Sequence, residues 1–142
     1  MAWQTRLTPE LARFVAEQDH FYLGTANAAG RPYIQHRGGP KGFLKVLGEN
    51  RLGFADFAGN QQFVTLGHLA ENPQAFLFLI DYPARRRVKI RGQARAVADD
   101  PALARSLADP AYPGRVERAI LISTNGTPTA RAISCRAGTP QP

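Results

Sequence analysis

The sequence predicts a mainly β protein of the α+β class, an antiparallel split β-barrel with two to three short helices. About seven segments have the apolar pattern of strands, and most of them are joined by short turns. Strands joined in this way pair antiparallel, and strands this short and numerous favour a closed or split barrel over an open sheet. With 142 residues, the chain is expected to form a single domain, 1–142.

The first elements are a helix and two hairpins. Thr8-Pro9-Glu10 has the cap, the proline and the acidic residue of a helix start, so residues 9–18 are expected to be helical within an N-terminal segment 1–19. Four strands follow as two hairpins, one turning at "NAAGRP" and the other at "GEN", with the Gly-rich loop "GGPKG" between them. Their expected ranges are 20–26, 33–37, 43–47 and 51–57.

A second helix is expected directly after the fourth strand. Asn60 supplies a capping amide, Asn72-Pro73 ends the helix, and apolar residues recur between them at helical spacing. The next segment, 74–81, is almost entirely apolar and predicts a strand that is buried on both faces. The remaining elements are expected to be a strand at 87–97, a short helix from Asp100-Pro101 to Leu107, and a strand at 116–123.

The net charge of +7 leaves two kinds of anionic partner open, nucleic acid and a small phosphorylated ligand. In the most basic stretch, residues 84–95, the cations alternate with Val88, Ile90 and Ala94, which favours a solvated strand face over a nucleic-acid groove. The single cysteine, Cys135, excludes an intrachain disulfide. Since no apolar run is long enough for a signal peptide or a membrane span, a soluble cytoplasmic protein is expected.

The sequence motifs of several enzyme classes are absent. There is no GxSxG elbow, no P-loop and no GxGxxG turn. The three histidines, His20, His36 and His68, lack the spacing of metal ligands, so no metal site is expected. Asp99-Asp100 indicates a helix start rather than a pair of catalytic acids.

What remains is a candidate anion site. Arg37 ends a strand beside the Gly-rich loop, Lys45 lies on the next strand, and Asn60, Gln61 and Gln62 open the second helix. A helix N-terminus favours phosphate through its unpaired N–H groups and its dipole, and arginine adds a bidentate charged contact. A solvated strand end explains Arg37 equally well on pattern alone, and a single lysine on a strand needs no functional explanation.

Three segments together resemble a known family. They are "FYLGTANAAGRPYIQHRGGPKGFLKVL", "LGFADFAGNQQFVTLGHLAENPQAFLFLID" and "VKIRGQARAV", and the similarity covers about three quarters of the chain, from His20 to Ile122. In this order they resemble the pyridoxamine 5'-phosphate oxidase-like family of FMN-binding split barrels.

The resemblance implies a flavoprotein with oxidoreductase chemistry on a substrate that the sequence does not identify. It implies a homodimer with FMN at the subunit interface. It also implies that Arg37 holds the FMN phosphate, that Lys45 approaches the flavin, and that Asn60, Gln61 and Gln62 complete the phosphate cradle. The family has two basic residues where Gln61 and Gln62 stand here. Amides still donate hydrogen bonds but lack the charge, so weaker binding is expected.

Two other ligand classes stay open. Other members of the wider fold bind haem or a deazaflavin, and a basic barrel of this kind is also suited to nucleic acid. The aromatic residues, however, lie within apolar strand patterns, which favours a role in the core over base stacking. The C-terminal substrate motif of true pyridoxamine phosphate oxidases has no convincing match here.

The C-terminal residues 123–142 depart from the family and are expected to form an irregular tail. The resembled branch ends in a segment like W-D-x-N-C-P-x-H-I. The tail can be translated back into codons and the reading frame moved so that each new codon starts at the third base of an old one. With allowed synonymous choices, "STNGTPTARAISCRAG" then becomes "HEWDANCPRHIVPRW", which contains that ending. This predicts a reading-frame shift near the Ser123 codon, after which Cys135 has no evolved role. The alternative is an authentic divergent tail.

Overall fold

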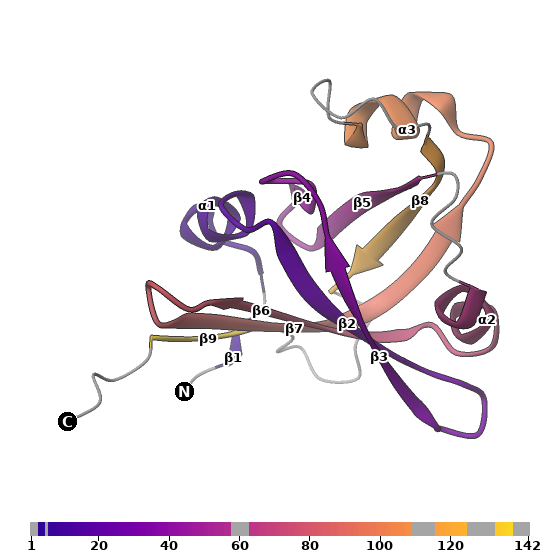
Figure 1. The fold of residues 1–142 in the computed structure, drawn as a ribbon, viewed down its shortest axis with the longest axis horizontal. Helices are drawn as coiled ribbons and strands as arrows, with labels where there is room; N and C mark the ends of the chain where they lie inside the picture. Colours follow the sequence, from indigo (N-terminus) through magenta and orange to yellow (C-terminus); the bar gives the residue numbers. More distant parts are fainter. Residues whose placement is uncertain (1–2, 5, 58–62, 109–115, 125–132, 138–142) are drawn as a thin grey trace.

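The computed structural model describes residues 3–4, 6–57, 63–108, 116–124 and 133–137. These residues form nine strands and three helices (Figure 1). In chain order they are β1 (Trp3–Gln4), α1 (Pro9–Ala16), β2 (His20–Ala26), β3 (Pro32–Gly38), β4 (Lys45–Gly48), β5 (Arg51–Phe57), α2 (Phe63–Glu71), β6 (Gln74–Asp81), β7 (Arg86–Val97), α3 (Pro101–Leu107), β8 (Val116–Ser123) and β9 (Ile133–Ala137).

All strand pairs are antiparallel, and the main sheet has the order β3-β2-β6-β7-β8-β5-β4. The sheet curls so that β5 and β8 lie above β6 and β7, with the core between them (Figure 1). This is the predicted antiparallel split barrel with short helices around it. The two predicted hairpins are confirmed as β2–β3 and β4–β5.

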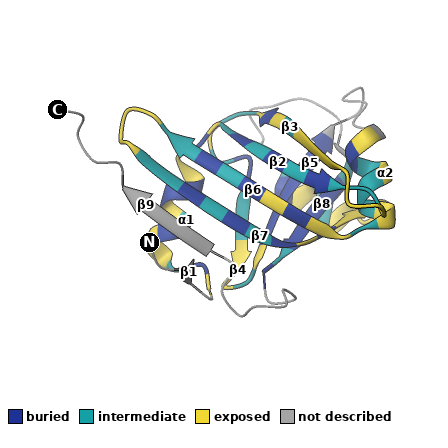
Figure 2. Ribbon diagram, turned by 90° about the horizontal axis from the view of Figure 1, so that it is seen from below, coloured by how far each residue is buried: buried dark blue, intermediate teal, exposed yellow. Residues whose placement is uncertain are grey.

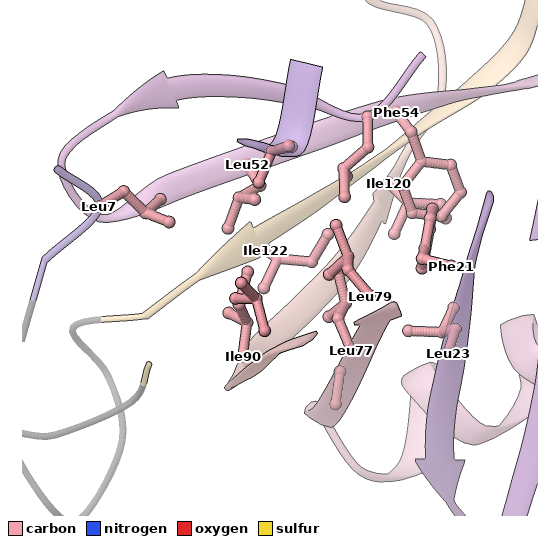
Figure 3. Packing of buried hydrophobic residues seen from close by; sticks show 14 of the residues in the cluster. Leu7, Phe21, Leu23, Leu52, Phe54, Leu77, Leu79, Ile90, Ile120 and Ile122 are labelled. Atoms are coloured by element: carbon pink, nitrogen blue, oxygen red, sulfur yellow. The ribbon is translucent and has the colours of Figure 1, made fainter. Parts of the chain in front are cut away.

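Along β2, β6 and β7 buried residues alternate with more exposed ones, whereas the middle residues of β5 and β8 are buried on both faces. Inward side chains of β2, β5, β6, β7 and β8 meet in one apolar cluster (Figure 3). Helix α1 adds one helical face to this cluster. At its centre Phe21 packs edge-on against Phe54, with ring centroids 5.3 Å apart, and stacks on Phe43 at 5.5 Å. Burying such large apolar side chains, each giving roughly 1.5–3 kcal/mol, stabilises the barrel.

The predicted caps of α1 and α3 are confirmed. The Thr8 hydroxyl accepts from the Leu11 N–H at 3.2 Å, and the Asp100 carboxylate accepts from the Leu103 N–H at 3.0 Å. Helix α1 ends at Ala16, two residues earlier than predicted, since the chain turns toward β2 there. The buried Gln18 side chain donates back to the Phe14 carbonyl at 3.1 Å.

The prediction that segment 74–81 is buried on both faces is wrong. Along β6 the buried residues Ala75, Leu77 and Leu79 alternate with more exposed ones, and Phe76 is 39% exposed. Figure 2 shows this alternation as bands of colour on β6 and β7. An apolar run is therefore not enough to prove two-sided burial, because the outer side chains can form a surface of their own.

The barrel splits where β8 leaves β7. Strand β8 pairs with β7 on one side and with β5 on the other, and both pairings end at Ser123, which is opposite Gln93 and Arg51. Beyond this point β9 pairs with β7, from Ile90 to Arg86. A Cβ at Gly92 would overlap the Ser123 carbonyl oxygen, so the close approach of β7 to the end of β8 requires glycine at this position. The residues of β9 lie within the tail that was expected to be irregular, and that expectation is wrong for 133–137.

Strand β9 is held by hydrogen bonds between backbone groups, and these form whether or not the tail sequence as a whole has an apolar period. The rest of the tail, at 125–132 and 138–142, lies outside the described residues. The two-residue strand β1 pairs with β9 and was also not predicted. No helix in the part of the chain that the structure describes has the length and apolar character needed to cross a membrane.

Candidate functional site

Arg37 is the site residue that the structure defines best. It lies on β3 opposite Phe21 of β2, and its side chain points into the barrel, where it is only 4% exposed. Its guanidinium lies over the Phe54 ring, 5.0 Å from the centroid, and Nη1 donates to Asp56 Oδ1 at 3.4 Å. A solvated strand end, the alternative explanation for Arg37, is therefore wrong.

The other edge of this guanidinium lacks an acceptor. Arg37 Nε and Nη2 are buried and make no hydrogen bond within the described structure. These two atoms form the side of the guanidinium that binds an oxoanion through two parallel hydrogen bonds. Burial lowers the pKa of Arg37, and the nearby Asp56 carboxylate opposes part of this change. A buried cation with two unused donors is costly unless an acceptor binds there.

Asp56 links Arg37 to a second arginine, Arg118. The Asp56 side chain is 4% exposed, and its Oδ2 lies 3.8 Å from Arg118 Nε. Asp56 and Arg118 are opposite each other in the β5–β8 pair, so their side chains share the inner face of the barrel. Sequence analysis missed both residues, although their positions two residues beyond the buried Phe54 and two before the buried Ile120 indicate inward-facing charges.

The first turn of α2 lies close to this cluster. The Thr65 hydroxyl, which is fully buried, donates to Gln35 Oε1 at 3.1 Å. Gln35 precedes Arg37 by two positions on the same face of β3, about 7 Å along the strand. The predicted site residues Asn60, Gln61 and Gln62 lie outside the described residues, directly before α2 begins at Phe63.

Lys45 is not brought together with Arg37. It is opposite Gly53 in the β4–β5 pair, whereas Arg37 covers Phe54, the next residue of β5. Because successive residues of a strand face opposite sides, Lys45 and Arg37 lie on opposite faces of β5. The Lys45 ammonium donates to the Gly42 carbonyl at 2.9 Å, which anchors the Gly-rich loop.

A second feature lies on the outer face of the sheet, defined here as the outward residues of β2, β3, β6 and β7. This face contains a hollow of about 610 Å³. Its lining includes Tyr22, Gly24, Ile34, Phe76, Phe78 and Arg91. Gly24 lies between Ile34 of β3 and Phe76 of β6, so the missing side chain deepens the hollow. The hollow was not predicted, and it lies on the opposite side of the sheet from Arg37.

The three histidines lie in two places, with His20 and His36 together and His68 apart from them. His20 stacks on His36, with ring centroids 5.7 Å apart, and its Nδ1 lies 2.9 Å from the exposed Asp19 carboxylate. His68 lies on α2, where its Nδ1 is 3.0 Å from the Thr25 hydroxyl. Among the described residues no three histidine, cysteine or acidic side chains are grouped as metal ligands.

Comparison with known proteins places the chain in a family. The family model described as pyridoxamine 5'-phosphate oxidase matches residues 7–134, which include the whole barrel and the start of β9. A search of curated proteins found no significant match.

Several solved structures share the fold. HupZ from Group A Streptococcus superimposes with a TM-score of 0.66 and 15% identity, over 82% of this chain and 87% of that one. An FMN-binding protein from Syntrophomonas wolfei superimposes with a TM-score of 0.62 and 12% identity, over 92% of this chain and 87% of that one. A third structure, from Clostridium acetobutylicum, is of a protein related to general stress protein 26 in the pyridoxinephosphate oxidase family. It superimposes with a TM-score of 0.57 and 16% identity, over 82% of each chain.

Proposed function

Because the chain belongs to the pyridoxamine 5'-phosphate oxidase family, we propose that it binds FMN and works as a flavin-dependent oxidoreductase. The same split barrel carries FMN in the Syntrophomonas wolfei protein, as that protein is described. Once bound, the flavin ring supplies the electron transfer, while the chain binds and orients it.

The observation that carries this proposal is the unused edge of Arg37. A phosphate group supplies the two acceptors that Nε and Nη2 lack, in the geometry that the guanidinium favours. The neighbouring first turn of α2 adds the favourable end of a helix dipole. Gln61 and Gln62 would add amide donors without charge, each weaker by roughly 1 kcal/mol or more than a basic side chain.

We propose further that the protein is a homodimer that packs through the outer face. Ile34 is 71% exposed and Phe76 is 39% exposed on this face, beside the hollow. Contiguous exposed apolar side chains are characteristic of interaction surfaces, and two-fold dimers bury such a patch against its own copy. The hollow also has the size and apolar character of a cofactor pocket.

The dimer is tested by light scattering, which should return twice the chain mass of 15.5 kDa. Phe76→Glu should give monomers, because it places a charge in the centre of the interface. Tyr82→Glu is the matched control, since Tyr82 is 65% exposed in the turn after β6 and does not line the hollow. A wild-type monomer would exclude the proposed assembly.

FMN binding is tested by titrating the purified protein with FMN and with riboflavin and following flavin fluorescence. Riboflavin has the same ring system but no phosphate. The proposal predicts tighter binding of FMN, and it predicts that Arg37→Ala removes most of the difference. Equal affinity for the two ligands would mean that the protein does not recognise the phosphate. The absorbance spectrum of the freshly purified protein distinguishes a flavin from haem or a deazaflavin.

One observation favours a second function, the binding of nucleic acid. The outward residues of β7 include Arg87, Lys89, Arg91 and Arg95, whereas Val88, Ile90 and Ala94 are buried as predicted. A row of cations on one strand attracts a phosphate backbone, with an affinity that falls steeply as salt rises. A labelled oligonucleotide that fails to bind at about 50 mM salt would exclude this function.

A further inference from the structure

We infer that Gln35 is a second ligand-binding residue of the Arg37 site and that its amide nitrogen donates to a hydroxyl on the chain that carries the phosphate. This inference rests on the proposed function and deepens it. It names the ligand class that the site selects, a phosphate ester of a hydroxylated chain.

Burial along the inner face of β3 decreases from Arg37 toward the start of the strand. Tyr33, Gln35 and Arg37 are two residues apart, so their side chains share one face. Arg37 is 4% exposed, Gln35 is half-buried and Tyr33 is 36% exposed. A ligand whose phosphate binds Arg37 is larger than the phosphate alone, so its remainder has to extend toward solvent past Gln35.

The opposite direction along β3 leads into packed side chains. Phe43, which follows the Gly-rich loop, is only 8% exposed and stacks on Phe21, the residue opposite Arg37. Gly39 lies so close to the Phe43 ring that a Cβ built on it would be 2.8 Å from the ring. This packing favours a ligand path toward Tyr33 over a path toward Gly39.

Thr65 of α2 orients the Gln35 amide. The Thr65 hydroxyl is fully buried and donates to Gln35 Oε1 at 3.1 Å, so the amide oxygen already has a partner. In the part of the chain that the structure describes, no residue accepts from Gln35 Nε2. An amide held in this way offers two N–H donors without charge, which suits a neutral oxygen such as that of a hydroxyl.

The two residues of β3 therefore recognise different parts of one ligand. Arg37 supplies the charge and the paired donors, Nε and Nη2, that a phosphate requires. Gln35 lies about 7 Å nearer to solvent along the strand and would meet the chain attached to the phosphate. FMN meets both requirements, because its ribityl chain carries hydroxyls next to the phosphate, whereas inorganic phosphate would engage only Arg37.

The experiment compares FMN with two flavins that each lack one of these features, by fluorescence titration of the full chain. Riboflavin lacks the phosphate, and phosphopentyl flavin keeps the phosphate but lacks the ribityl hydroxyls. Gln35→Met should weaken FMN binding about 3- to 10-fold, the loss of one hydrogen bond to a neutral oxygen, and leave the affinity for phosphopentyl flavin unchanged. Arg13→Met, at an exposed position on α1, is the control and should bind all these flavins as the wild type does.

Thr65 is tested as a positioning residue. Thr65→Val should weaken FMN binding without changing the affinity for phosphopentyl flavin, because the Gln35 amide loses the donor that orients it. Thr65→Ser keeps the hydroxyl and should bind FMN as the wild type does. Equal losses of FMN affinity in the two variants would overturn the positioning role.

The outcomes separate this inference from the proposed function. A loss of affinity in Gln35→Met that is confined to the flavins with ribityl hydroxyls supports the inference. An equal loss for FMN and phosphopentyl flavin, or no loss, overturns it. If Gln35→Met fails to fold, the wild type decides, since tighter binding of FMN than of phosphopentyl flavin supports the inference and equal binding overturns it. Equal binding of FMN and riboflavin to the wild type overturns the proposed function itself.

Discussion

Replacing Arg37 by methionine should separate the contribution of this residue to folding from its contribution to binding. Methionine keeps an unbranched apolar stem over the Phe54 ring and removes the guanidinium. The variant therefore removes one hydrogen bond to Asp56, at 3.4 Å, together with the two buried donors that have no acceptor in the described structure.

The expected change in stability without ligand is small. Breaking a buried ion pair costs about 3–5 kcal/mol when the remaining charge is left without a partner, but Asp56 still lies 3.8 Å from Arg118. Removing two unsatisfied buried donors relieves about 1–3 kcal/mol for each of them. The two effects have opposite sign, so the free energy of unfolding should change by less than about 2 kcal/mol.

The expected change in binding is larger and specific to FMN. Loss of a bidentate charged contact should weaken FMN binding by about 1–3 kcal/mol, or roughly 5- to 150-fold, with riboflavin binding unchanged. Urea unfolding without ligand and fluorescence titration with both ligands measure the two quantities, and Arg13→Met serves as the control. A loss of stability well above 3 kcal/mol, or unchanged FMN affinity, would refute the reasoning.

Four further results are expected. Gly92→Ala should lower the free energy of unfolding by about 2–3 kcal/mol in urea denaturation, because the new Cβ overlaps a backbone carbonyl of β8. The hydrogen bond with His20 lowers the pKa of Asp19 below its ordinary value of 3.8, so the stabilisation by this carboxylate is present above pH 3.8 and is lost as the pH falls through the lowered pKa. Asp19→Asn should therefore lower the thermal unfolding temperature at about pH 5 and leave it unchanged at about pH 2. Gln61→Arg with Gln62→Lys should tighten FMN binding in the fluorescence titration, and no gain would mean that the phosphate lies elsewhere. Sequencing of the gene tests the reading-frame shift, and an Asn125 codon ending in C would exclude it.

Local patterns predicted most of the secondary structure correctly. Strand-like segments on either side of turn sequences located β2 and β5, and side-chain caps located α1 and α3, because these features depend only on neighbouring residues. The pairing of β9 with β7 was not predictable in this way, since it is made by backbone groups of segments distant in sequence. The same holds for the separation of Lys45 from Arg37 across β5, which depends on strand register.

The candidate site was predicted in part. The sequence predicted that Arg37 binds an anion, but it did not show that the side chain is buried with two donors that lack an acceptor. It also missed Asp56 and Arg118, which come next to Arg37 only after β3, β5 and β8 are placed around one core. Asp56 and Arg118 could have been recognised from the sequence, because each is two positions from a buried strand residue, Phe54 or Ile120, and therefore faces inward. A charge at an inward position implies a partner or a ligand.

A crystal structure of the protein grown with FMN tests the central claim most directly. Phosphate oxygens are expected about 2.7–2.9 Å from Nε and Nη2 of Arg37, with Asp56 still facing Nη1. A phosphate group bound elsewhere, with these two Arg37 donors still lacking an acceptor, would contradict it.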